Sequence, residues 1–427
     1  MKKSFVVFTG LIIGLAIFGL AAFHSNVLLL SIPLIVYLFS AIYYRPEDLK
    51  FTVSREVNPE HAPQGTPIQV KLTVANRGPA IDELVIKEIF PKGIQKMVGK
   101  SAIVTWLAPQ ASVELEYSIK AVRGQYDTYD VTVNSGDFCG FFSLPAIYRT
   151  NPHLVIHPRY PKLDRIKVRP PQTRGFAGPI AARQGGIGID FYGVREYHSG
   201  DPQRQINWKI IARRDQELFT NIFEQERVAD VGLILDARQR MDVSSPYGSL
   251  FEHSVRATAA LAENFLSDGN RVSLLVYGGG LESVFPGYGR IQKDRILKAL
   301  AKTNPGMNYA LDSLAYLPTR FFPASSQIVI ISPLSPDDIS VIIQMRAHGY
   351  AVMLISPDPI SYASAIQNDF TSQAYRLAYA ERDFMLQQVR RSGVQVVNWR
   401  VDQPLEIAVR EALSRQPVVM YQKGIGI

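Results

Sequence analysis

Cysteine is almost absent from this chain of 427 residues, which contains only Cys139. A single cysteine cannot form an internal disulfide or a metal cage built from several thiolates, and it fits a reducing compartment. The chain also lacks internal repeats and low-complexity tracts, so its length is the best guide to its organisation. Since 427 residues exceed what one core usually organises, we expect a membrane anchor and two soluble domains.

Charge is missing from two long apolar runs near the N-terminus, at residues 5–23 and 27–44. The first would form ~28 Å of helix, which matches the hydrocarbon core of a bilayer. The sequence therefore predicts a two-helix transmembrane hairpin over residues 1–45. The alternative is a cleaved signal peptide, with Ala21 and Ala22 as its small-residue site. The length of the first run and the second run that follows it both favour the hairpin.

Positive residues flank both outer ends of this hairpin, whereas its turn carries no fixed charge. Lys2 and Lys3 precede the first run, and Arg45, Lys50 and Arg55 follow the second. The positive-inside rule places such ends in the cytoplasm. We therefore predict a multi-pass protein of the inner (plasma) membrane, with two spans and with both termini and the soluble domains in the cytoplasm.

Acids are scarce relative to bases: 38 Asp and Glu stand against 46 Lys and Arg, for a net charge of +8. The imbalance is sharpest between residues 158 and 188, where Asp164 is the single acid. This basic connector contains Arg159, Lys162, Arg165, Lys167, Arg169, Arg174 and Arg183. Its prolines and glycines predict no regular structure. A solvated linker and a contact with anionic lipid headgroups are both open, and no nucleic acid is expected because no reader motif accompanies the charge.

Residues 51–158 show the period-two alternation of antiparallel strands, as in Ile68, Val70, Leu72 and Val74. Six strands are predicted, at residues 51–57, 68–74, 84–89, 103–107, 113–119 and 129–133. Their spacing favours an immunoglobulin-like β-sandwich that serves as a spacer or docking module. Phe141 and Phe142 are expected to be buried where this sandwich meets the next domain, and an exposed contact patch is the alternative.

Residues 159–214 join the basic connector to a dense segment of glycines and charges. The loop 185–188 resembles a phosphate cradle, but it lacks the Lys-Ser/Thr and the spacing of a dinucleotide fingerprint. Asp201 as N-cap, Pro202 at the first position and Arg213 at the end predict a helix over residues 202–213. An internal ion-pair network is a further expectation for this segment. Its members would be Asp190, Arg195, Asp201, Arg204 and Arg213.

Three stretches of this segment closely resemble the signature of the domain of unknown function 58 family. They read Gly-x-Asp-Phe-x-Gly-Val-Arg-Glu-Tyr from Gly188, Gly-Asp-x-x-Arg-x-Ile-Asn-Trp from Gly200, and Ala-Arg at residues 212–213. The resemblance implies a membrane-anchored protein with a von Willebrand factor A-like domain, whose gene often neighbours that of a MoxR-type AAA ATPase. It marks as signature or interaction residues Gly186, Gly188, Asp190, Phe191, Gly193, Arg195, Tyr197, Gly200, Asp201, Arg204, Asn207, Trp208 and Arg213.

From residue 215 to 427, apolar strands alternate with amphipathic helices. Strands are predicted at residues 231–235, 272–277, 328–331, 351–355 and 394–397, and a long helix at 250–266. This alternation is typical of a doubly wound parallel sheet with helices on both faces. Such sheets bind ligands beyond the carboxyl ends of their strands.

In a von Willebrand A domain, that edge holds a divalent cation through Asp-x-Ser-x-Ser. Here the same place reads Asp236-Ala237-Arg238-Gln239-Arg240, so arginines replace both serines, and Ser332 follows a later strand where an Asp is usual. We therefore predict no metal at Asp236, the degenerate metal-site position. Asp236 is expected either to pair with a neighbouring arginine or to be a plain strand-end carboxylate.

No constellation predicts catalysis. Asp337 and Asp338 are interpreted as first-turn helix acids, and His253 and His348 lack an evident nucleophile partner. The favoured function is a membrane-anchored, non-enzymatic adaptor or assembly factor, without a cofactor, that binds proteins through the degenerate von Willebrand A-like domain. Its expected partners are the lipid bilayer and a MoxR-type AAA ATPase. The alternatives are a phosphate-ligand enzyme that uses the loop 185–188 and a metal-dependent adhesion protein.

Overall fold

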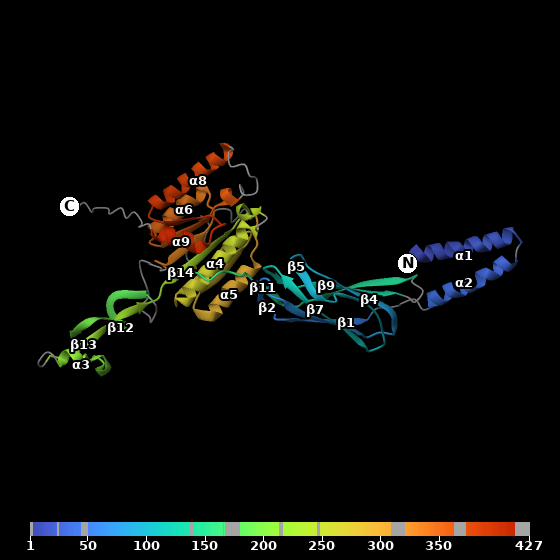
Figure 1. Ribbon diagram of the computed structural model, residues 1–427, viewed down its shortest axis with the longest axis horizontal. Coiled ribbons are helices and arrows are strands. Elements are labelled where there is room, and N and C mark those ends of the chain that lie inside the picture. Colours follow the sequence, from blue (N-terminus) through green and yellow to red (C-terminus); the bar gives the residue numbers. More distant parts are fainter. Residues whose placement is uncertain are drawn as a thin grey trace. The chain divides into compact units, whose positions relative to one another are not determined.

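The computed structural model describes residues 3–23, 25–43, 50–136, 141–164, 166, 180–212, 217–245, 248–308, 321–362 and 373–414. Cys139, Arg45, Arg213 and most of the basic connector lie outside this set. The chain divides into two compact units, Met1–His157 and Pro158–Ile427 (Figure 1). The apolar cores of the two units are composed of separate sets of residues.

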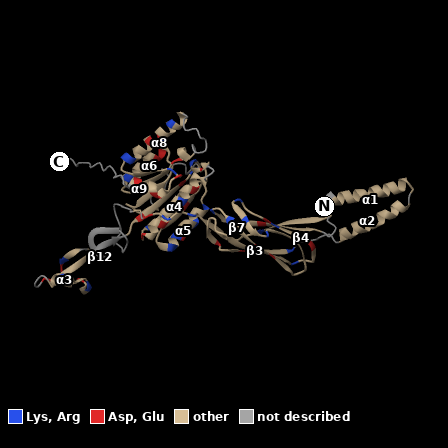
Figure 2. Cartoon of the chain, in the orientation of Figure 1, with Lys and Arg blue, Asp and Glu red and all other residues tan. Residues whose placement is uncertain are grey.

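The first unit begins with two apolar helices, α1 (Lys3–Ala21) and α2 (Ser25–Tyr43). Apart from Lys3, neither helix contains a charged residue (Figure 2). The stretches Ser4–Ala21 and Ser25–Tyr43 are long and apolar enough to cross a membrane. Large side chains such as Val7 and Phe39 are exposed, which suits contact with lipid better than contact with water. Both predicted helices are therefore confirmed.

Eight strands follow in two antiparallel sheets that share one core, here called the two-sheet domain. The sheet orders are β1-β3-β7-β5 and β10-β9-β4-β6. The strands are β1 (Phe51–Asn58), β3 (Ile68–Asn76), β4 (Ile81–Ile89), β5 (Ile94–Gly99), β6 (Ala102–Leu107), β7 (Ser112–Ala121), β9 (Tyr129–Gly136) and β10 (Ser143–Thr150). All six predicted strands are present. The core contains Ile68, Val70, Leu72 and Val74, the residues that reveal the alternation.

A smaller sheet completes this unit. It has the order β2-β11-β8, with β2 (His61–Pro63), β11 (Leu154–His157) and β8 (Gly124–Tyr126). Leu154 and Ile156 belong to the same core as the two large sheets.

Two residues of this unit have different surroundings from those expected. Arg55, counted among the charges that flank the hairpin, is buried and pairs with Glu88 across the two sheets. Because its charge is neutralised inside the core, only the remaining flanking residues can face a membrane. Phe141 and Phe142 are buried, but their neighbours are Phe5, Phe8 and Leu38 of the hairpin. The predicted contact with the next domain was therefore wrong, because the loop that carries these rings lies at the end of the two-sheet domain that meets the helices.

The second unit contains a six-stranded sheet of order β18-β17-β14-β19-β20-β21. Its strands are β14 (Asp230–Ala237), β17 (Arg271–Gly278), β18 (Leu281–Gly287), β19 (Gln327–Ile331), β20 (Ala351–Pro357) and β21 (Gln395–Trp399). All pairings are parallel except that of the edge strand β18. The five predicted strands are confirmed, and β18 is the addition that the sequence did not reveal.

Helices cover both faces of this sheet. Residues of α4 (Leu250–Ser267), α5 (Gly289–Lys302) and α9 (Leu405–Ser414) form one core with Leu233 and Leu235. Residues of α6 (Pro336–Ala347) and α8 (Gln373–Arg391) form the other core with alternate strand residues such as Ile234. Because every core strand is covered on both sides, it reads as a continuous apolar run.

The segment before this sheet also differs from expectation. Residues 180–188 of the basic connector, which were predicted to lack regular structure, belong to β12 (Ile180–Glu196). This strand pairs with β13 (Phe219–Arg227) in an irregular antiparallel ladder. The predicted helix over residues 202–213 is reduced to a short 3-10 turn, Gln203–Gln205, and one turn of α-helix, α3 (Trp208–Ile211). Ile206 has an extended backbone and interrupts the two.

Candidate functional site

The candidate site lies at the carboxyl ends of β14 and β19, the neighbouring strands where the order of the parallel sheet reverses. Strand β14 pairs with β17 on one side and with β19 on the other. The chain therefore leaves β14 and β19 in opposite directions across the sheet, and ligands of such sheets commonly bind at a switch point of this kind. After β14 the chain enters a 3-10 turn, Gln239–Met241, and after β19 it enters α6.

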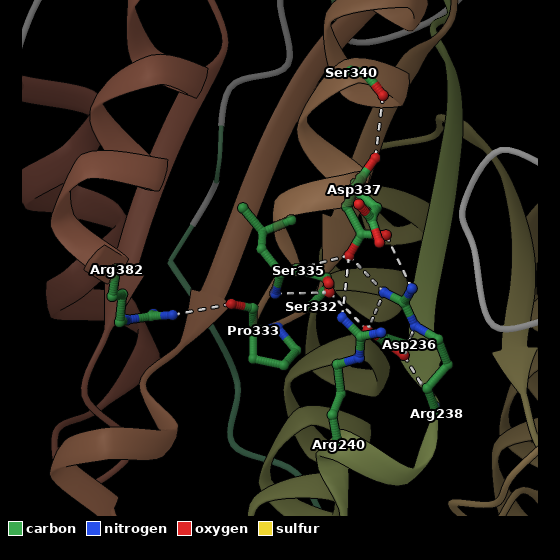
Figure 3. A network of polar contacts seen from close by, with 11 residues as sticks. Asp236, Arg238, Arg240, Ser332, Pro333, Ser335, Asp337, Ser340 and Arg382 are labelled. Atoms are coloured by element: carbon green, nitrogen blue, oxygen red, sulfur yellow. Dashed lines mark hydrogen bonds and ion pairs between the residues drawn. The ribbon is translucent and has the colours of Figure 1, made fainter. Parts of the chain in front are cut away.

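A buried guanidinium occupies this edge. Arg238 donates from Nε and Nη2 to the two carboxylate oxygens of Asp236, at 2.9 and 2.7 Å (Figure 3). It also donates from Nη1 and Nη2 to the two oxygens of Asp338, at 2.9 and 2.8 Å. The three side chains are at most 3% exposed. Arg238 thus bridges two carboxylates in the bidentate geometry that suits its planar group.

The protonation of Arg238 follows from this environment. Burial disfavours its charge, but the hydrogen bonds and charges of Asp236 and Asp338 outweigh that penalty and raise the pKa of Arg238. Arginine is already charged at any physiological pH. The cluster therefore contains a permanent cation at the position where the von Willebrand A resemblance would place a metal.

The loop after β19 holds both carboxylates in place. Ser332 donates from Oγ to Asp236 Oδ2 at 2.7 Å and accepts from the backbone N–H of Leu334 at 3.1 Å. Leu334 has a φ of 67°, which a residue with a branched side chain seldom adopts. The backbone N–H of Ser335 donates to Asp338 Oδ2 at 2.8 Å. Strain at Leu334 is thus offset by a set of buried hydrogen bonds.

Arg240 is the most exposed charged residue of this cluster. Its Nη1 lies 3.6 Å from Asp338 Oδ2, and its side chain is 28% exposed. The positive charges of Arg238 and Arg240 thus balance the negative charges of Asp236 and Asp338. Of the two interpretations of Asp236, the structure shows the ion pair. Across the described part of the chain, no three His, Cys, Asp or Glu side chains converge as metal ligands.

Asp338 is a first-turn acid of α6, as the sequence indicates, but it is also fully buried and paired with Arg238. The spacing Ser335-x-x-Asp338 is that of a capping box, and this signal predicts an acid that turns back toward the chain. Its complete burial was not predictable from that spacing. Asp337 is close to the expectation, because its backbone oxygen accepts a hydrogen bond from Ser340 on the exposed side of α6.

The signature residues lie in a different place, on the β12–β13 hairpin and the turn that follows β12. Arg195 Nη2 donates to Asp201 Oδ1 at 2.7 Å, and Asp201 Oδ2 accepts from the backbone N–H of His198 at 3.0 Å. The hydrogen bond from Arg195 lowers the pKa of Asp201. Gly200 has a φ of +112°, which only glycine adopts readily. This part of the signature therefore fixes a turn.

The remaining signature residues that the structure describes divide between half-buried and exposed positions. Asn207, rather than the predicted Asp201, caps α3 by accepting from Ile210 N–H, and it donates to Asn221 on β13 at 2.6 Å. Phe191 and Trp208 are 60% and 67% exposed. Tyr197 N–H donates to the backbone of Leu218. Of the predicted ion-pair network, the described residues show the Arg195–Asp201 pair, whereas Arg204 is exposed on the 3-10 turn and Arg213 lies outside them.

Comparisons with known proteins show a family model and a curated protein to which this chain is similar. Residues 193–356 match the model of the family described as protein of unknown function DUF58. The uncharacterized protein YeaD of Bacillus subtilis (strain 168) is 26% identical over 302 residues, which cover 67% of this chain and 71% of that protein. The DUF58 match includes most of the signature residues, from Gly193 onward, and the cluster at Arg238.

Solved structures add little to this. The FixG-related protein of Vibrio parahaemolyticus is 16% identical over 25% of this chain and 97% of its own, with a TM-score of 0.16. A fragment of Escherichia coli alpha-2-macroglobulin is 16% identical over 30% of this chain and 21% of its own, with a TM-score of 0.22. Likenesses at these scores carry no argument about the fold.

The glycines upstream of the DUF58 match do not form a loop. Gly185 pairs with Glu224 and Gly186 with Phe223, and the register shifts on both sides of them, so Gly186 and Gly188 lie within β12. Asp190 is also on this strand. A phosphate cradle requires backbone N–H groups at the start of a helix. The predicted loop 185–188 was therefore wrong, because Gly185 and Gly186 pair with β13 and residues 187 and 188 lie in the irregular part of the same strand.

A second buried arginine lies at the same sheet edge, beyond the DUF58 match. Arg382 on α8 donates to Ser356 Oγ and to Asn398 Oδ1, both at 3.0 Å, and to the backbone oxygen of Pro333 at 3.0 Å. Its Nε lies 3.5 Å from Asp358 Oδ1. Burial lowers the pKa of Arg382, and the charge of Asp358 opposes this effect. Arg382 therefore ties the ends of β19, β20 and β21 together, a role that no pattern in the sequence predicts.

Proposed function

We propose that this protein is a membrane-anchored, non-enzymatic adaptor whose α/β unit binds a protein partner. The observation that carries the proposal is the Arg238 guanidinium between Asp236 and Asp338, at a sheet edge where ligands commonly bind. We infer that the six-stranded sheet is a degenerate von Willebrand A-like domain in which this arginine replaces the metal. Recognition would then depend on side chains alone.

The chemistry of the cluster favours binding over catalysis. The oxygens of Asp236 and Asp338 are engaged by Arg238, Ser332 and the loop backbone, so neither carboxylate is available as a general base. A divalent cation would have to displace a charged, doubly bridged guanidinium. Arg240 combines a positive charge with partial exposure, which suits an acidic side chain of a partner.

Resemblance supports a MoxR-type AAA ATPase as that partner. Such a contact requires the α/β unit to face the cytoplasm, and the positive residues Lys2, Lys3, Arg45 and Lys50 support this topology. In this arrangement the two-sheet domain is an immunoglobulin-like spacer between the membrane and the α/β unit. A reporter fused after Ile427 should be active only in the cytoplasm, and periplasmic activity would refute the topology.

Metal independence can be tested in the full chain reconstituted in nanodiscs. Thermal unfolding of the wild type should not shift on addition of magnesium, calcium or ATP. The double variant R238S/R240S restores Asp-x-Ser-x-Ser and leaves two buried carboxylates uncompensated, so magnesium should raise its melting temperature. The triple variant D236A/R238S/R240S should lose that response. A metal-dependent shift of the wild type that D236A abolishes would refute the adaptor proposal.

Partner binding needs a separate experiment. Crosslinking and affinity purification from membranes should recover an AAA ATPase with the wild type and with R295E, whose residue is exposed on α5. The variant R240E should lose the ATPase, because it reverses the exposed charge of the cluster. Equal recovery with both variants would show that the cluster is not the contact surface.

A further inference from the structure

The contact between the two-sheet domain and the hairpin involves a pair of phenylalanines. The ring of Phe141 lies 5.0 Å from that of Phe8 and 5.7 Å from that of Tyr37, and the ring of Phe142 lies 5.3 Å from that of Phe5. Phe141 and Phe142 are only 5% and 8% exposed. Their partners belong to the stretches Ser4–Ala21 and Ser25–Tyr43, which are apolar enough to cross a membrane.

The depth of these partners along the helices matters. At ~1.5 Å of rise per residue, Phe8 lies ~7.5 Å beyond the start of α1, and Tyr37 lies ~9 Å before the end of α2. The interfacial layer of a bilayer is about 5–7 Å thick on each side. If α1 and α2 cross a membrane, the rings of Phe141 and Phe142 must reach the depth of that layer.

Strand register carries further residues to the same end of the domain. Gly136 of β9 pairs with Ser143 of β10 and with Glu83 of β4, so the loop that contains Phe141 and Phe142 adjoins the start of β4. Ile81 of β4 pairs with Leu107 in the outermost row of the sheet, and Trp106 is the residue next to Leu107. Trp106 is 70% exposed.

Two positive residues lie at this end as well. Phe51 pairs with Asn76, and residues 77–80 alone connect the end of β3 to the start of β4. The backbone N–H of Arg77 donates to Lys50 at 2.7 Å, so the two exposed cations are neighbours. Asp82 is also exposed there. The apolar and aromatic side chains are therefore expected to contribute more to membrane contact than the net charge.

We infer that this end of the two-sheet domain is seated in the phospholipid interface, with Phe141 and Phe142 inserted beside the hairpin, Trp106 at headgroup level, and Lys50 and Arg77 facing lipid phosphates. Tryptophan favours this layer because its ring is apolar and its N–H is polar. The domain is thus held on the bilayer surface instead of hanging on a flexible tether. This inference rests on the membrane anchoring in the proposed function.

Brominated lipids provide the test, because bromine quenches tryptophan fluorescence on contact. The full chain is reconstituted in nanodiscs with and without phosphatidylcholine brominated on its acyl chains. The chain has three tryptophans, and Trp399 is buried whereas Trp208 is 67% exposed in the second unit. We expect W106F to remove most of the bromine-dependent quenching and W208F, the matched control, to remove almost none.

A second pair of variants tests the phenylalanines. F141S/F142S should reduce the quenching of Trp106, because the domain would lift from the interface, whereas F285S, at an exposed position of β18, should not. If the chain elutes with nanodiscs but the wild type and W106F show equal bromine-dependent quenching, the inference is overturned. Failure to elute with nanodiscs would instead refute the membrane anchoring itself.

Discussion

Arg55 in the two-sheet domain and Arg238 in the α/β unit are both almost inaccessible to solvent, yet their surroundings differ. Arg55 pairs with one carboxylate, that of Glu88, donates to Thr150 Oγ1 at 2.5 Å and lies 4.5 Å from the centre of the Tyr129 ring. Arg238 pairs with two carboxylates. Arg55 connects two facing sheets in the middle of a core, whereas Arg238 lies at the end of strands.

The pKa values show what this difference means. Burial raises the pKa of Glu88, and the charge of Arg55 only partly opposes the effect. At Arg238 the order of the two effects is reversed, because two carboxylates outweigh burial and raise its pKa. Glu88 can therefore escape the loss of its partner by taking up a proton. Loss of the Arg238 cation would leave two adjacent buried carboxylates, those of Asp236 and Asp338, instead of one.

The largest effect should follow from Arg238→Met. It leaves Asp236 and Asp338 buried without their cation, which should lower the free energy of unfolding by about 3–5 kcal/mol. Urea unfolding can be followed by the fluorescence of Trp399 in a W106F/W208F background, because Trp399 is buried in this unit. Adding D236N and D338N should restore part of the loss. An unchanged midpoint for R238M would contradict the assigned role.

Arg55→Met should cost less, about 2–3 kcal/mol near pH 8, because Glu88 can become neutral. A carboxyl whose folded pKa is raised binds more protons in the folded state, so stability falls as pH rises above the unfolded pKa. Without Arg55 this pKa should rise further. The deficit relative to the wild type should therefore shrink toward pH 5. Hydrogen exchange of β3 and β4 measures this loss of unfolding free energy. A loss that does not change with pH would contradict the mechanism.

Ser332→Ala should have a smaller effect, about 1 kcal/mol. The variant removes the donor to Asp236 and the acceptor for Leu334 N–H, but it leaves Arg238 in place. The Trp399 unfolding assay applies again. Ser340→Ala is the matched control, since its hydroxyl is exposed and bonds only the backbone of Asp337 among the contacts described (Figure 3). Equal shifts of the unfolding midpoint for Ser332→Ala and Ser340→Ala would show that the Ser332 hydroxyl does not stabilise the cluster.

Asp201→Asn should have the smallest effect on this unit. Its ion pair with Arg195 is local to the turn after β12, so the Trp399 transition should not move, while hydrogen exchange of residues 190–201 should accelerate. The pKa of Asp201 is lowered, so its contribution is present at neutral pH and is lost as pH falls through the folded pKa. The wild-type and variant exchange rates should therefore converge in acid. A shift in the unfolding transition reported by Trp399 would instead show that the turn after β12 contributes to the stability of the six-stranded sheet.

Local patterns predicted much of the fold. The alternation at Ile68–Asn76 and the apolar run in Asp230–Ala237 each identify a strand. A strand buried on one face alternates apolar and polar residues, and a strand buried on both faces is apolar throughout. The β12–β13 ladder escaped prediction because β12 is rich in glycine and shows neither pattern. The helix over residues 202–213 was overestimated because the capping signals at Asp201 and Pro202 outweighed the break at Ile206.

The sequence by itself determined the two apolar helices, the positions of most strands along the chain and the presence of arginine beside Asp236. These properties depend on residues close together in the chain. Only the tertiary structure decided that Asp338 meets Arg238 from 100 residues away, that Ser332 completes the cluster, and that Phe141 faces the hairpin. Strand order and sheet register bring those side chains together, and no local pattern encodes which strand ends become neighbours.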